Sequence, residues 1–279
     1  MDSDEAATCF IASYGGRATR LSRVRECNII GSGDFARCNL FLRWKKVVAM
    51  YNSKRIIALV PARGGSKGIK RKNVMALGGR PLISYTIEAA LASKYIDTVI
   101  VSTDDREIAN VARGLGALVP FYRPADLATD EAPTIGVVLH AMEYLESIGD
   151  VYETLVLLQP TQPLRATADI DEALEFHFAN DERSLVSVSL VDDHPLLIRT
   201  IDGNNSAVRL IDANSTCRRQ DMPTFYKVNG CIYINSINEL SSRTSFNDND
   251  LAFVMDPNHS VDIDEIKDAF IAEYYLNNL

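Results

Sequence analysis

The 279-residue sequence lacks the features that mark membrane, secreted and metal-cluster proteins. No apolar run reaches the ~20 residues that span a bilayer, and the N-terminus has no apolar signal-peptide core. The five cysteines are odd in number and form no C-x-x-C pair, so neither a disulfide framework nor a zinc site is indicated. These absences predict a cytoplasmic protein.

Motifs of several enzyme classes are missing as well. The sequence contains no G-x-x-x-x-G-K-[ST] run, which disfavours a P-loop nucleotide hydrolase. None of the four histidines has a partner at metal-ligand spacing, and no Ser/His/Asp or Cys/His arrangement indicates a covalent nucleophile. The net charge of −8 argues against general binding to nucleic acid or to an anionic membrane.

The composition is that of a soluble globular protein, with 47% apolar and 24% charged residues. A chain of this length can bury a core without disulfide or metal staples, and it has room for one or two domains. Residues 1–53 differ from the rest, because they hold eight Lys/Arg against five Asp/Glu in an otherwise acidic protein. We predict a poorly ordered extension over 1–53 and one domain over 54–279.

The most informative stretch is RIIALVPARGGSKGIKRKN, residues 55–73. Its apolar run, Ile56–Val60, has the length and β-branched content of a buried parallel strand. A glycine-rich loop with five cations follows: Arg63, Lys67, Lys70, Arg71 and Lys72. Glycines let a backbone approach a ligand closely, and cations crowded at a strand end repel one another unless an anion is bound. We therefore predict a nucleotide triphosphate site here, with a solvated basic turn as the alternative.

Short apolar segments alternate with amphipathic ones after this loop. The expected strands are 95–102, 117–122 and 154–158, and the expected helices are 81–92, 106–115, 133–146 and about 168–180. Asp104 or Asp105 can cap the second helix, and Gly116 can end it. The alternation predicts an α/β fold with a doubly wound, mostly parallel sheet. Ligands of such sheets bind beyond the carboxyl ends of the strands, where the basic loop lies.

The rhythm changes after Leu185. Expected strands at 186–191, 197–201, 208–211 and 231–234 predict a small β-rich insert over about 186–258. A last βα unit follows, with a strand at 252–255 and a helix that ends near Tyr275.

Two carboxylates precede this last helix. In extended backbone, Asp262 and Asp264 point to the same face. Neighbouring carboxylates both stay ionised when a cation lies between them, and Mg²⁺ fits that requirement. The alternative makes Asp264 the N-cap of the helix and leaves Asp262 solvated.

The segment LLQPTQPLR, residues 157–165, leaves a strand between two prolines. The Gln159 amide could read a base edge, and Thr161 or Arg165 could meet the ligand. A purely structural turn accounts for the segment equally well. Further along, Arg218, Arg219 and Lys227 are cations that could hold a substrate carboxylate, with a solvated loop as the alternative.

Taken together, these segments resemble the CMP-sialic acid synthetases, or acylneuraminate cytidylyltransferases, from about Arg55 to the C-terminus. The hallmark ARxxSKGxxxKN of that family is matched by residues 62–73. Five more motifs follow in the family's order: VSTD at 101–104, RPADLA at 123–128, LLQPTQPLR at 157–165, NGCIY at 229–233 and DID at 262–264. The first 50 or so residues lie outside the resemblance.

The resemblance implies a Rossmann-like nucleotidyltransferase that transfers CMP from CTP to the anomeric hydroxyl of a nonulosonic acid and releases pyrophosphate. It assigns nucleotide binding to seven residues: Arg63, Gly65, Ser66, Lys67, Asn73, Arg123 and Gln159. It assigns catalysis to four: Arg63, Lys67, Lys72 and Asp264. Arg219, Asn229 and Tyr233 would face the sugar, and Asp262 and Asp264 would hold the cofactor Mg²⁺. Asp264, or hydroxide on the metal, is the candidate general base. Members of the family resemble one another in being homodimers whose β-rich insert reaches the partner's site.

One departure affects the substrate. Many sialic acid synthetases carry a basic residue after a His-Pro element, where this chain reads HPLLI at 194–198. Leucine cannot bind a carboxylate or a hydroxyl, so legionaminic, pseudaminic and KDO-type acids are alternatives to N-acetylneuraminic acid. A non-catalytic nucleotide-binding regulator is an alternative of another class, and the presence of both Asp262 and Asp264 argues against it.

Overall fold

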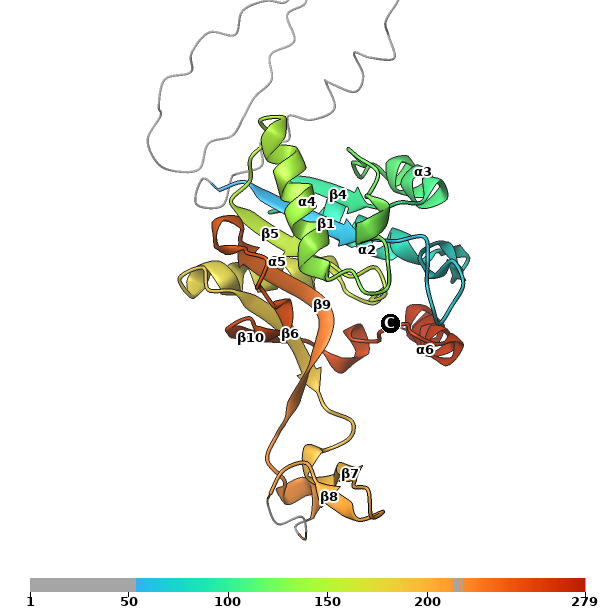
Figure 1. Cartoon of the computed structure of the whole chain (residues 1–279), viewed down its shortest axis with the longest axis vertical. Coiled ribbons are helices and arrows are strands. Elements are labelled where there is room, and N and C mark those ends of the chain that lie inside the picture. Colours follow the sequence, from blue (N-terminus) through green and yellow to red (C-terminus); the bar gives the residue numbers. More distant parts are fainter. Residues whose placement is uncertain (1–53, 213–215, 217, 279) are drawn as a thin grey trace, which may run out of the picture. The chain divides into compact units, whose positions relative to one another are not determined.

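The computed structural model describes residues 54–212, 216 and 218–278, all of one compact unit (Figure 1). The predicted extension over 1–53 lies outside the described residues. Within the described part of the chain, no helix is long and apolar enough to cross a membrane.

A six-stranded sheet forms the centre of the fold, in the order β10-β6-β9-β5-β1-β4. Its strands are β1 (Ile56–Pro61), β4 (Thr98–Ser102), β5 (Thr154–Leu157), β6 (Leu185–Leu190), β9 (Tyr226–Ser236) and β10 (Leu251–Val254). β1 pairs in parallel with β4 and β5, and β10 pairs in parallel with β6. β9 runs antiparallel to both of its neighbours. The predicted α/β fold with a mostly parallel sheet is confirmed.

The side chains of β1 point alternately to the two faces of the sheet. Ile56, Ala58 and Val60 belong to one buried cluster, which α2 (Leu82–Ala92), α3 (Arg106–Leu115) and α5 (Thr167–Ala179) cover. Ile57 and Leu59 belong to a second cluster, which α4 (Thr134–Ser147) covers from the other side (Figure 1). All five side chains are fully buried, which explains why the strand reads as a continuous apolar run.

The helix predicted at 106–115 is observed as α3 with the same bounds. Asp105 caps it, since its carboxylate accepts from the backbone N–H of Glu107 and Ile108. Gly116 ends it in the left-handed conformation at φ 101°. The helices α2, α4 and α5 lie within one residue of their predicted bounds, whereas α6 (Ile266–Asn278) continues beyond Tyr275.

The strand predicted over 117–122 is wrong. Only one isolated bridge forms, between Ile100 and Leu118. Leu118 is 54% exposed, and Pro120 lacks the N–H that a further ladder bond requires. Conversely, the structure contains a short hairpin of β2 (Ala76–Leu77) and β3 (Arg80–Pro81) that the sequence pattern does not indicate.

The β-rich region expected over about 186–258 divides into two parts. Its strands β6, β9 and β10 belong to the central sheet. Outside that sheet, β7 (Arg199–Ile201) and β8 (Ala207–Arg209) form a two-stranded hairpin beyond the ends of β6 and β9 (Figure 1). The reversed direction of β9 follows from this connection, because a parallel return would need a crossover helix.

Candidate functional site

A cleft of about 630 Å³ lies at the carboxyl ends of β1 and β5. It is bounded by the basic loop after β1, the loop before α4, the segment after β5 and the chain before α6. Ten residues singled out from the sequence line it: Arg63, Ser66, Lys67, Lys72, Asn73, Arg123, Gln159, Thr161, Asp262 and Asp264. Segments from both ends of the domain therefore meet in one site.

The basic loop is fixed by its own polar groups. Asn73 is buried, and its amide nitrogen donates to the carbonyl oxygen of Arg63 at 2.9 Å. The Asn73 Oδ1 atom is buried without a hydrogen-bond partner. At the loop's start, the Gly64 N–H donates to Asp104 Oδ1 at 2.8 Å. Asn73 thus braces the loop with one end of its amide, while the other end is a buried acceptor without a partner among the described residues.

Lys72 joins this loop to the chain before α6. Its Nζ donates to the carbonyl oxygen of Ile263 at 2.8 Å and to Asp264 Oδ1 at 3.0 Å. Gly68 lies so close to this chain that an added Cβ would be 2.5 Å from the backbone oxygen of Asp264. A Cβ on Gly65, by contrast, would meet nothing within 4 Å. Gly68 is thus a loop glycine that a close approach to backbone requires, whereas Gly65 is exposed and outside the cleft lining.

Arg123 is a buried cation beside the basic loop. Its guanidinium donates to the hydroxyl and the backbone carbonyl of Ser102. Burial lowers the pKa of Arg123 to about 10, the nearby Asp104 opposes this, and the positive charge of Arg63 adds to it. Among the described residues, no carboxylate forms a salt bridge with Arg123. A buried guanidinium in this position is stabilised by an anion in the cleft.

The late aspartates face the cleft from the opposite side. Ile263 between them is fully buried, so Asp262 and Asp264 both project outward, as the extended backbone predicts. Desolvation raises the pKa of Asp262, and the charges of Asp264 and Asp268 raise it further, against a hydrogen bond from Thr161. Solvent still reaches Asp262 through the cleft. A cation between the two carboxylates would favour their ionised forms.

The alternative role of Asp264 as a helix cap is not observed. At the start of α6, the carboxylate of Asp268 accepts from the backbone N–H groups of Asp264 and Glu265 at 3.0 and 2.7 Å. The Asp264 carboxylate remains with Lys72 and the cleft.

A divalent cation fits this pair only with help from a ligand. In the part of the chain that the structure describes, no group of three or more His, Cys, Asp or Glu side chains is placed to hold a metal. Mg²⁺ is commonly bound by one or two carboxylates together with substrate phosphates and waters. Asp262 and Asp264 supply the protein part of such a donor set.

Residues of the loop after β5 divide between the cleft and the interior. Gln159 and Thr161 line the cleft, and Gly230 must be a glycine there, because an added Cβ would be 2.9 Å from Gln159 Oε1. Arg165 is buried, and it donates to the carbonyl of Cys231 at 2.7 Å and to the hydroxyl of Thr86 at 2.8 Å. Arg165 is therefore a structural residue, and the sequence-based suggestion that it meets the ligand is wrong for this arrangement.

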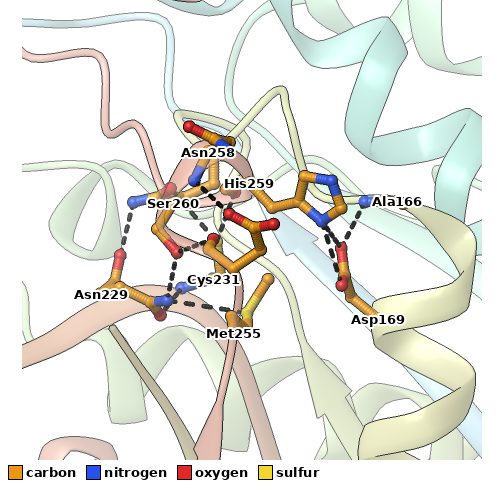
Figure 2. A network of polar contacts seen from close by, with 10 residues as sticks. Ala166, Asp169, Asn229, Cys231, Met255, Asn258, His259 and Ser260 are labelled. Atoms are coloured by element: carbon orange, nitrogen blue, oxygen red, sulfur yellow. Dashed lines mark hydrogen bonds and ion pairs between the residues drawn. The ribbon is translucent and has the colours of Figure 1, made fainter. Parts of the chain in front are cut away.

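Two of the three residues expected to face the sugar, Asn229 and Tyr233, do not line the cleft. Asn229 is buried: its Oδ1 accepts from Ser187 at 2.6 Å and its Nδ2 donates to Ser260 at 2.9 Å (Figure 2). Tyr233 is also buried, and its hydroxyl donates to Asn247 at 2.9 Å. Burial, with a smaller effect of Asp262, raises the pKa of Tyr233 to about 12. Arg219 begins a short 3-10 helix, and its side chain lies outside the described part of the structure.

A polar network fixes the chain just before the aspartates. His259 Nδ1 is 2.9 Å from Asp169 Oδ2, which also accepts from the backbone N–H of Ala166 at the start of α5 (Figure 2). Together with the Asn229–Ser260 bond, this contact anchors the turn that leads into Asp262. His259 thus helps to fix the position of this turn.

The sequence-based assignment missed one charged contributor to the phosphate side. Asp130 lines the cleft and forms ion pairs with Arg63 and Lys67. Its only sequence signal is an acidic residue seven positions after Arg123, in a loop at the same edge of the sheet.

The chain is similar to known cytidylyltransferases. A family model described as cytidylyltransferase matches residues 57–272. A CMP-N,N'-diacetyllegionaminic acid synthase of Legionella pneumophila is 38% identical, over 69% of this chain and 82% of that protein. An N-acylneuraminate cytidylyltransferase of Escherichia coli is 36% identical over 78% of this chain, which spans about half of that longer protein (51%). A pseudaminic acid cytidylyltransferase of Campylobacter jejuni is 34% identical over 80% of this chain and 97% of that protein.

Solved structures share the fold at low sequence identity. A CMP:2-keto-3-deoxy-manno-octonic acid synthetase complexed with CTP has a TM-score of 0.61 at 15% identity, covering 80% of this chain and 99% of that one. A 4-diphosphocytidyl-2C-methyl-D-erythritol synthase of Anaerococcus prevotii has a TM-score of 0.55 at 14% identity, covering 80% and 99%.

The contact at Gly68 can be tested by a matched pair of substitutions. Gly68→Ala should lower the free energy of unfolding by about 1–3 kcal/mol, because the new Cβ must displace the backbone of Asp264. Gly65→Ala should stay within about 0.5 kcal/mol of the parent, since its Cβ enters open space. Urea unfolding of the two variants measures both values, and equal midpoints would refute the close approach.

Proposed function

Because this chain belongs to the cytidylyltransferase family, we propose that it transfers CMP from CTP to the anomeric hydroxyl of a nonulosonic acid and releases pyrophosphate. The observation that carries this proposal is the meeting of the basic loop and the late aspartate pair in one cleft. A phosphate-binding wall and a metal-binding wall that face each other suit phosphoryl-group chemistry. The comparisons give no support to a non-catalytic regulator.

On the phosphate side, Arg63, Lys67 and Lys72 hold the triphosphate, with Ser66 and the backbone at Gly65 as further donors. Arg63 and Lys67 already share one carboxylate, so their charged ends lie close enough to bind one polyanion. Lys72 donates to Asp264 on the opposite wall, and we assign it to the reacting phosphate. Clustered cations stabilise the negative charge that develops on the phosphoryl and leaving oxygens.

On the nucleoside side, Asn73 and Gln159 bind the ribose and the base of CTP, and Arg123 lies between them and the phosphates. The free acceptor of Asn73 fits a ribose hydroxyl, which donates hydrogen bonds. The amide of Gln159 can both donate to and accept from the edge of cytosine. The buried guanidinium of Arg123 favours the anionic part of the ligand.

Asp262 and Asp264 are the residues that would hold Mg²⁺. When bound there with the nucleotide, Mg²⁺ neutralises charge on the phosphate oxygens. Asp264 is the better placed of the two to accept the proton of the anomeric hydroxyl, because its carboxylate is largely exposed to the cleft. In the transfer, the anomeric oxygen forms a bond to the α-phosphorus, the bond from the α-phosphorus to the bridging oxygen breaks, and pyrophosphate leaves with that electron pair.

On the side of the site that would bind the sugar, Arg219 is proposed to meet the sugar carboxylate, as the family resemblance implies. The polar atoms of Asn229 and Tyr233 form hydrogen bonds inside the protein, so we propose that these two residues hold the neighbouring segments of the site in position.

The relatives are named for legionaminic, neuraminic and pseudaminic acids and have similar sequence identities to this chain, so the proposal covers the nonulosonic acids as a class. CTP is a cytoplasmic metabolite, and we propose the cytoplasm as the location.

The reaction is tested by pyrophosphate release. With CTP and Mg²⁺, the protein should release pyrophosphate only when a nonulosonic acid is present, because the anomeric hydroxyl is the nucleophile. N-acetylneuraminic, legionaminic, pseudaminic and KDO acids are assayed one by one, and the largest kcat/KM identifies the substrate. Absence of pyrophosphate with every acid would refute the proposed activity.

The role of Asp264 is tested by Asp264→Ala. We expect kcat/KM to fall by about 10²–10⁴-fold, the range for loss of a general base. The unfolding midpoint should change little, because the Lys72–Asp264 pair is partly exposed and contributes at most about 1 kcal/mol. Asp193→Asn, which removes an exposed charge elsewhere, is the control. Near-normal turnover of Asp264→Ala would exclude Asp264 from the mechanism.

We also propose a homodimer that uses the hairpin region. Large apolar side chains are exposed there: Leu190, Ile201, Val208, Tyr226 and Val228. Such a patch on a soluble protein favours association.

Light scattering should give a mass twice that of the 30.9 kDa chain. Ile201→Glu combined with Val208→Glu should shift the mass to the monomer, whereas Ile148→Glu, at an exposed apolar site after α4, should not. A parent protein that is monomeric at micromolar concentration would refute this proposal.

A further inference from the structure

Asp130 binds two of the three cations that we assign to the triphosphate, Arg63 and Lys67. Its Oδ1 is 2.6 Å from the terminal nitrogen Nη2 of Arg63, and its Oδ2 is 3.2 Å from Nζ of Lys67. The neighbouring Thr129 carbonyl accepts from Arg63 Nη1 at 2.7 Å. One short loop segment therefore lies on the face of the basic loop that carries the charged ends of Arg63 and Lys67.

These contacts can be exchanged. The side chains of Arg63 and Asp130 are each about one-third exposed (31% and 32%), and that of Lys67 is 73% exposed. Ion pairs of this kind are weak in water, because solvent screens them and long side chains lose freedom in forming them. The segment around Asp130 has no regular secondary structure and lies between a 3-10 turn at Ala125–Leu127 and α4. Phosphate oxygens can thus replace this carboxylate without disturbing the sheet.

The rest of the cleft shows that the carboxylate does not satisfy the cations fully. Arg123 lies near enough to Arg63 for the two positive charges to repel each other, and it forms no salt bridge with Asp130. One carboxylate faces the guanidinium of Arg63 and the ammonium of Lys67, with the buried charge of Arg123 behind them. A polyphosphate carries more charge than one carboxylate and is the stronger ligand for this set.

We propose that Asp130 is an internal competitor of the β- and γ-phosphates: it holds Arg63 and Lys67 in the free protein, yields them to CTP, and takes them back as pyrophosphate leaves. The proposal rests on the proposed function, because it uses the assignment of these two cations to the triphosphate. Because Asp130 is tethered beside them, its carboxylate acts at a high effective concentration. It thereby weakens the binding of the leaving pyrophosphate and favours its release.

A competitor of this kind affects only those ligands that need both cations. CTP and pyrophosphate must displace Asp130, and both lose affinity by the same factor. CMP carries a single phosphate, which lies at the reacting position beside Lys72, and it leaves the Asp130 contacts in place. A specific exchange therefore lowers the affinity for CTP and pyrophosphate but not for CMP, whereas a general effect of negative charge near the cleft would lower the affinity for all three.

The test compares Asp130→Asn with Asp126→Asn by calorimetric titration of inorganic pyrophosphate, CTP and CMP. Asparagine has nearly the shape of aspartate but no charge. Asp126 is an exposed aspartate of the same loop that does not line the cleft, so it matches the change in net charge. Pyrophosphate is titrated in EDTA, so that no metal complex contributes to the binding.

Asp130→Asn should bind pyrophosphate and CTP about threefold to tenfold more tightly than the parent, which is about 0.7 to 1.4 kcal/mol at 1.4 kcal/mol per tenfold. This is the range for the loss of two partly exposed ion pairs. CMP affinity should be unchanged, and Asp126→Asn should resemble the parent with all three ligands. In turnover, Asp130→Asn should show stronger product inhibition by pyrophosphate.

Three results would overturn the proposal. Unchanged or weaker pyrophosphate binding by Asp130→Asn would make Asp130 a residue that orients the cations. Equal tightening of CMP, or equal effects of Asp126→Asn, would reduce it to general electrostatics. If the parent protein bound neither pyrophosphate nor CTP, the triphosphate site itself would fail, together with the proposed function. In the first two cases CTP still binds, so the two failures are distinguishable.

Discussion

The cleft depends on one contact between distant parts of the chain, the junction of the basic loop with the segment around Ile263. Lys72 donates to the Ile263 carbonyl and to Asp264, and Gly68 lies against the Asp264 backbone. Ile263 itself is fully buried in a small cluster with Ile69 of the loop and with residues of α2 and α6. The buried side chain of Ile263 thus holds the segment against the protein, and the contacts with Lys72 keep Asp264 turned toward the cleft. Without this junction the phosphate side would have no opposite wall.

Much of the scaffold could be predicted because its signals are local. A continuous apolar run marked β1, and a capping aspartate and a terminal glycine marked both ends of α3. Arg63 and Gln159 could be placed at the cleft because they follow the ends of β1 and β5, and strand ends meet at one edge of a parallel sheet. Asp262 and Asp264 precede α6 instead, and their two-residue spacing and their motif indicated them. The direction of β9 was not evident, because an apolar pattern is the same in both chain directions.

The remaining differences come from burial and from contacts across space. The segment 117–122 has β-forming residues but no partner strand beyond one bridge. Asn229 and Tyr233 belong to a motif that looked like a ligand site, yet their polar atoms are used inside the protein. Asp130 carries no motif, and only its position opposite Arg63 and Lys67 gives it a role. The roles of these residues depend on which loops come together in the folded protein, and the spacing of residues along the chain does not reveal those contacts.

The junction at Ile263 also bears on the order in which the protein folds. Lys72 and Asp264 are separated by 192 positions in the chain, and contacts of such sequence separation form late, after local helices and neighbouring strands. During synthesis, β1, β4, β5 and their helices emerge long before the aspartates do. A partly made chain can therefore bury most of its core while the two walls of the cleft are still apart. The cleft is complete only after the segment around Asp264 has been synthesised and has packed against the basic loop.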